Sequence, residues 1–301
     1  MKIRHVIASS ALVLAGAADM YAHRVWVLPA VTVLSGTDQW VSFEAAVSNN
    51  LFFPNHRPVG LAQIEVIGPD GKPVEIQNAT AGQIRSSFEL HLQQQGTYVV
   101  SLRPGQGRAP QQASAAPTAG AAAPQYPAGP GGAMRGGLNG TYEEDGKTVR
   151  WRGTPETLVS EGVAAKPGFK LRESGGRKVV TYVTLGKPTD EVLAPTGTGL
   201  EVDFVTHPND LFAGEPAEFR FLLEGKPAAG AEVTVVRGDD RYRDEAGDVN
   251  LRADADGVVK IAWPQPGRYW LEATASTAGT LHGMPSEKSF TYIATFEVLP
   301  D

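Results

Sequence analysis

Cysteine is absent from this chain of 301 residues, so it offers neither a disulfide bond nor a thiolate nucleophile. An excess of basic residues is also missing, because the formal net charge is −6. Nucleic-acid binding needs a concentrated basic surface, and the charge argues against it. P-loop, G-x-S-x-G and H-E-x-x-H motifs are absent too, as is G-x-G-x-x-G after a strand. We therefore expect no enzyme activity and no nucleic-acid partner.

Long apolar runs are missing after the first residues, so we expect no transmembrane segment in the mature chain. The first residues do contain one shorter run, over 6–18, which follows a basic start and precedes small residues. This pattern predicts a signal peptide over residues 1–22 and a periplasmic protein. A cut after Ala22 would make His23 the first residue, where a strand pattern begins. A cut after Ala18 fits the small-residue rule better.

What is present is a β-sheet pattern. Apolar and polar residues alternate over 39–47 and 86–92, and the stretch 61–76 has a Pro-Asp-Gly turn between two candidate strands. We predict an all-β fold of two Ig-like β-sandwich domains with a disordered Pro/Gly/Ala-rich insertion. The first domain covers 23–103, and residues 141–195 are expected to complete it. The second covers 196–301.

The insertion is predicted over residues 104–140. It consists mostly of Pro, Gly, Ala and Gln, and Arg108 and Arg135 are its only charged residues. A segment with so few large apolar side chains cannot offset the entropy of ordering, which favours a flexible linker. Beyond it, Thr154 and Pro155 are typical of the start of a short helix.

Histidines are the remaining candidates for chemistry, because "DADG" (254–257) is better explained as a hairpin turn than as a calcium loop. If His23 is the first residue of the mature protein, its α-amine has a pKa of about 7.7–8.0 and can chelate a metal together with its imidazole. His207 and His282 are in predicted loops and are the expected partners of His23. Nitrogen donors of this kind suit copper(II) better than calcium or magnesium. The alternative is that His23 only begins a strand.

Several phrases of the sequence resemble a periplasmic family of unknown function whose members were formerly described as nickel-uptake, NikM-like, components. They are "AHRVWV", "SNNLFFPNHRPVGL", "GPDGKPV", "VTHPNDLFAGEPAEFRF" and "DADGVVKIAWPQPGRYWLEA". The resemblance covers nearly all of 23–301 except the linker. It implies a β-sandwich protein of the cell envelope linked to metal-ion or outer-membrane uptake, with His23 and His207 as the matching histidines. The sequence departs from the family at Arg24, where many members have an acidic or small polar residue.

Two classes of function remain open at this stage. The first is an exported accessory protein that binds copper or nickel and acts beside an outer-membrane receptor or another envelope protein. The second is a metal-free structural or protein-interaction module of the envelope. A copper oxygenase built on His23 has no support elsewhere in the chain, and an Ig-like fold alone does not decide among these functions.

Overall fold

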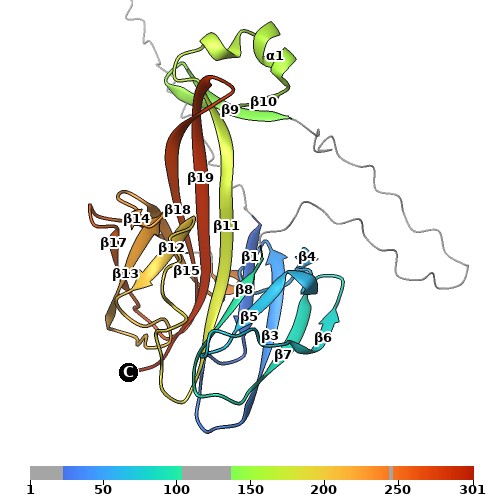
Figure 1. The fold of residues 1–301 in the computed structure, drawn as a ribbon, viewed down its shortest axis with the longest axis vertical. Coiled ribbons are helices and arrows are strands. Elements are labelled where there is room, and N and C mark those ends of the chain that lie inside the picture. Colours follow the sequence, from blue (N-terminus) through green and yellow to red (C-terminus); the bar gives the residue numbers. More distant parts are fainter. Residues whose placement is uncertain (1–22, 104–136, 244–246) are drawn as a thin grey trace, which may run out of the picture.

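The computed structural model describes residues 23–103, 137–243 and 247–301 (Figure 1). The predicted signal peptide (1–22) and most of the predicted linker lie outside them. The described residues confirm the all-β prediction. Their helical segments are all short, namely α1 (Pro155–Ser160) and the 3-10 turns η1 (Leu61–Gln63), η2 (Val163–Ala165) and η3 (Asp240–Tyr242). No helix in this part of the chain has the length and apolar character needed to cross a membrane.

The strands of the described residues form three sheets. The first sheet consists of β1 (Arg24–Pro29), β3 (Gln39–Ser48), β4 (Arg57–Pro58), β6 (Gln77–Ala81) and β7 (Ser86–Leu92). The third consists of β12 (Leu200–Phe204), β13 (Pro216–Leu223), β14 (Lys226–Pro227) and β17 (Val258–Ala262). The second, central sheet consists of β2 (Val33–Leu34), β5 (Ile64–Ile67), β8 (Gly96–Leu102), β9 (Leu138–Glu144), β10 (Lys147–Gly153), β11 (Lys170–Leu185), β15 (Glu232–Arg237), β16 (Val249–Arg252), β18 (Gly267–Leu281) and β19 (Met284–Val298).

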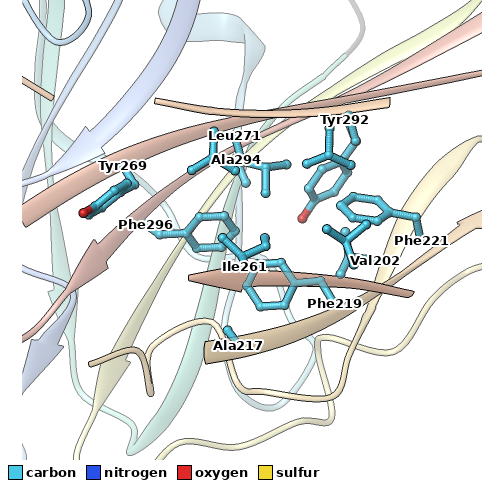
Figure 2. Close-up of a cluster of buried hydrophobic side chains, with 14 of the residues drawn as sticks. Val202, Ala217, Phe219, Phe221, Ile261, Tyr269, Leu271, Tyr292, Ala294 and Phe296 are labelled. Atoms are coloured by element: carbon cyan, nitrogen blue, oxygen red, sulfur yellow. The ribbon is translucent and has the colours of Figure 1, made fainter. Parts of the chain in front are cut away.

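The central sheet contributes to the two larger of the three hydrophobic cores found among the described residues. Because side chains alternate along a strand, Tyr292 and Ala294 of β19 pack toward the third sheet, whereas Ile293 packs toward the first. The core beneath the third sheet is rich in aromatic residues, including Phe219 and Phe296 (Figure 2). The two sandwiches therefore share a central sheet, and the pairing of β11 with β19 joins them.

Local signals in the sequence agree well with the structure. The alternation over 86–92 corresponds to β7, and Thr154 caps α1 with Pro155 in its first turn, as predicted. Two details differ. β9 begins at Leu138, inside the range predicted as linker. The second arm of the predicted hairpin over 61–76 is reduced to a bridge at Pro73, which has no N–H to donate to a ladder.

Candidate functional site

A solvent-open cavity of about 910 Å³ lies where the first sheet meets the part of the central sheet that contains β9, β10 and the middle of β11. Its walls come from the start of β1, from β4, from the end of β8, from the β9–β10 hairpin and from the middle of β11 and β19. Its charged and titratable lining residues are Arg57, Arg103, Arg150, Arg172, Arg177, Glu173, His23 and His56. We call it the cationic cavity, because its lining contains five arginines and only one carboxylate, that of Glu173.

His23 and His56, which both line this cavity, stack on one another. Their ring centroids are 4.0 Å apart and their planes differ by 10°. The pairing of the first sheet explains the contact. β1 and β4 both pair with β3, and the two histidines immediately precede these strands, so that they flank Ser48 at the end of β3. Both side chains are exposed to solvent.

The surroundings of His56 disfavour its protonated form. Partial desolvation is the largest cause, and the positive charges of His23 and Arg57 act in the same direction, so the pKa of His56 is lowered. A neutral imidazole retains a lone pair on one nitrogen, which is the form that binds a metal ion.

The middle of β11 forms one wall of the cavity, and its hydrogen-bonding edge is open there. β11 pairs with β9 at Lys170–Leu171 and with β8 at Tyr182–Leu185. Between these two contacts, residues 172–181 pair with β19 alone among the described strands. The cavity thus occupies the gap that β9 and β8 leave along one strand.

A β-bulge directs two arginines of β11 into this gap. Residues an even number apart share a face of a regular strand, so Arg172 and Arg177 would point to opposite faces. The register with β19 shifts between Ser174 and Gly176, which adds one residue to β11, and both arginines line the cavity. Gly176 has a φ of 128°, in the region that favours glycine.

His207 lies outside the cavity, and its ring nitrogens are engaged. Nδ1 accepts a hydrogen bond from the backbone N–H of Asn209 at 3.0 Å, while Nε2 lies 3.1 Å from the hydroxyl of Thr97. Thr97 also contacts Thr184 of β11. Thr184 is five residues beyond Val179, the last residue of β11 that lines the cavity, which corresponds to about 17 Å of strand.

His282 lies at the far end of the long hairpin formed by β18 and β19. It has a φ of 50° and is followed by Gly283 with a φ of 75°, as a two-residue turn between antiparallel strands requires. The indole N–H of Trp270 donates to the carbonyl of Val25, two residues from His23. The turn follows Leu281, eleven residues along β18 from Trp270, or about 36 Å.

The structure therefore does not bring His23, His207 and His282 together. It places His56 beside His23 instead. The sequence alone did not single out His56, because only the pairing of β1 and β4 with the same strand brings the two histidines into contact. Within the described residues, no group of three or more His, Cys, Asp or Glu side chains is arranged to hold a metal ion.

Comparison with known proteins identifies a family but no activity. A family model described as "Domain of unknown function (DUF4198)" matches residues 20–277. No curated protein matches the chain. Among solved structures, the D0-D1 domain of intimin is 11% identical over 91% of this chain and 98% of its own, with a TM-score of 0.20. A trypsin-activated alpha-2-macroglobulin from Escherichia coli is 11% identical over 93% of this chain and 16% of its own, with a TM-score of 0.22. Scores this low carry no argument about fold or function.

Proposed function

This chain belongs to that DUF4198 family of unknown function, and from this premise we propose that it is an exported, non-catalytic accessory protein that binds a transition-metal ion at His23 and His56. The observation that supports the proposal is the contact between the two imidazoles, whose ring centroids are 4.0 Å apart. Export supplies the third donor, because removal of residues 1–22 leaves a free α-amine on His23. The donor set is then one amine and two imidazoles.

The geometry of the pair requires one small adjustment. The ring planes are nearly parallel, so the lone pairs of the two imidazoles do not converge on one point. Both side chains are exposed, and a rotation about a side-chain bond of either residue would reorient its ring. Metal–nitrogen bonds are near 2 Å, so rings in contact are close enough to share an ion after such a rotation.

The arginines of the cavity restrict which ion can bind. Their positive charge opposes a cation that is held mainly by electrostatic attraction, as calcium and magnesium are. An ion that forms strong bonds to nitrogen can overcome this repulsion, and copper(II) and nickel(II) are high in the order of affinities for such donors. We therefore propose Cu(II) or Ni(II) as the ion.

The cellular role that we propose follows from export and from the resemblance to nickel-uptake components. The protein would act in the periplasm and deliver or hold metal beside an outer-membrane receptor or another envelope protein. The exposed position of His23 and His56 suits transfer to a partner, because a donor or acceptor protein can reach them.

The test is a titration of the exported protein, whose first residue is determined by intact mass, with Cu(II), Ni(II) and Zn(II). We expect 1:1 binding of Cu(II) or Ni(II) to a protein that begins at His23. His23→Ala, or one extra residue before His23, should abolish tight binding, and His56→Ala should weaken it about ten-fold or more. His282→Ala is the matched control, since His282 is equally exposed and remote from the pair, and it should bind as the wild type does.

Absence of stoichiometric binding, or equal effects of His282→Ala and His56→Ala, would overturn the metal proposal. The metal-free interaction module would then take its place. That function predicts no change of melting temperature on addition of metal and an envelope partner that is recovered by crosslinking.

A further inference from the structure

We infer that the cationic cavity binds a small polyanion that carries two or more carboxylate or phosphate groups. Its five arginines come from four separate segments of the chain, which meet only in the folded protein. The cavity volume of about 910 Å³ is within the range of small-molecule sites. This inference concerns the arginines and does not depend on metal binding at His23.

Within the described residues, one of the five cavity arginines forms an ion pair. Arg103 forms an ion pair with Glu65 at 3.0 Å. No ion pair within the described residues involves any of the other four, which are Arg57, Arg150, Arg172 and Arg177. Positive charge is therefore concentrated here in a chain whose formal net charge is −6.

Two carboxylates outside the cavity act on these arginines without forming an ion pair with them. Glu287 acts on Arg172 through space but forms its ion pair with Lys170. Glu272 also acts on Arg177 through space, and no ion pair between the two is found within the described residues. Residues 104–136 contain no Asp or Glu that could supply a carboxylate from the chain itself.

The chemistry of arginine indicates the ligand class. A guanidinium presents a planar set of N–H donors that matches the two oxygens of a carboxylate or the oxygens of a phosphate. The arginines reach the cavity from β4, from β10 and from both sides of the bulge in β11, so they surround a volume rather than a point. One monoanion would leave most of them unpaired, whereas a molecule with several anionic groups can contact more than one.

Neutral polar groups complete the lining. Gln63, Asn139, Ser174, Ser289 and Thr291 face the same cavity and offer additional hydrogen bonds to oxygen atoms. The apolar part of the lining consists of Val25, Val47, Val59, Leu102 and Val179. The ligand that suits this lining is small, highly polar and rich in anionic oxygen.

The experiment is calorimetric titration of the exported protein with citrate, pyrophosphate and acetate. Bound metal is first removed with a chelating resin, since soluble chelators are themselves polycarboxylates. We expect saturable 1:1 binding of citrate or pyrophosphate, no measurable binding of acetate, and weaker binding as salt rises. Arg172→Gln and Arg177→Gln should each reduce the affinity about ten-fold, because hydrogen bonds to charged groups are strong.

Arg85→Gln provides the matched control, because Arg85 is an exposed arginine that pairs with Glu44 and does not line the cavity. It changes the net charge by the same amount and should leave the affinity unchanged. His23→Ala should also retain anion binding, which separates this inference from the metal proposal. No saturable binding of either polyanion, or equal losses in Arg85→Gln and Arg177→Gln, would overturn it.

Discussion

The two halves of β11 differ sharply although they belong to one strand. Residues 170–178 are exposed or half-buried except for Leu171, whereas all seven residues from Val179 to Leu185 are buried. The first half lines the cationic cavity, and among the described strands residues 172–178 pair with β19 alone. The second half lies between the two cores, where Val180 packs toward the third sheet and Val183 toward the first. The first half therefore carries the candidate site, and the second half holds the sandwiches together.

The largest expected effect is a loss of stability when a buried side chain in the second half of β11 is shortened. Leu185 is completely buried, so Leu185→Ala removes apolar contacts and leaves a cavity. We expect the free energy of unfolding to fall by about 2–5 kcal/mol. Arg177→Gln, in the exposed first half, should change it by no more than about 0.5 kcal/mol. Urea unfolding followed by circular dichroism measures both.

Similar losses in Leu185→Ala and Arg177→Gln would contradict the division of β11 into a stabilising half and a ligand-facing half. A large loss in Arg177→Gln alone would show that the bulge and its arginines are required for folding. The anion titration would then need a milder variant, Arg177→Lys, which retains the charge.

A second prediction concerns the polar pair inside the aromatic core. The hydroxyls of Tyr182 and Tyr292 are 2.6 Å apart and fully enclosed, and burial raises the pKa of both phenols. Tyr182→Phe should lower the free energy of unfolding by about 1–3 kcal/mol, because the Tyr292 hydroxyl is left buried without its partner. Tyr292→Phe should have the same effect.

The double variant with both tyrosines changed to phenylalanine sharpens this prediction. It removes the two polar groups together, so it should be more stable than the sum of the single losses implies. Unfolding measurements on the four proteins give the coupling energy directly. Simple additivity would mean that the two hydroxyls do not depend on one another.

Much of the local structure was predictable from sequence. The alternation over 86–92 predicts β7, and Thr154 with Pro155 predicts the start of α1, because strand periodicity and helix capping depend on neighbouring residues. The parallel pairing of β11 with β19 was not predictable in this way, because more than a hundred residues separate the partners and no local signal specifies it.

The candidate site shows the same limit. The chemical reason to consider His23 is visible in the sequence. Its spatial neighbour His56 is 33 positions away, and the two come into contact only because β1 and β4 both pair with β3. The five arginines of the cavity are scattered between positions 57 and 177 and form no motif. The bulge that turns Arg177 into the cavity depends on the register with β19, which is again a non-local property.

The smallest expected effect is a pH dependence from the buried half of β11, to which His207 is linked through Thr97 and Thr184. Burial lowers the pKa of His207 below the 6.5 of an unfolded chain, and protonation of Nδ1 would also break the hydrogen bond from Asn209. The unfolded state therefore takes up this proton first as the pH falls. The contribution to stability is complete above pH 6.5, declines as the pH falls below 6.5, and is lost once the pH is below the folded pKa.

Unfolding by urea at several pH values between 8 and 5 isolates this effect. Other groups titrate in the same range, so the relevant quantity is the difference between wild type and His207→Asn. We expect the wild type to lose more stability than His207→Asn on acidification, because asparagine takes up no proton. His282→Asn should follow the wild type, since His282 lies exposed in a hairpin turn outside this network. If wild type and His207→Asn gave parallel profiles, the burial of His207 would carry no proton linkage, and the buried half of β11 would be insensitive to pH in this range.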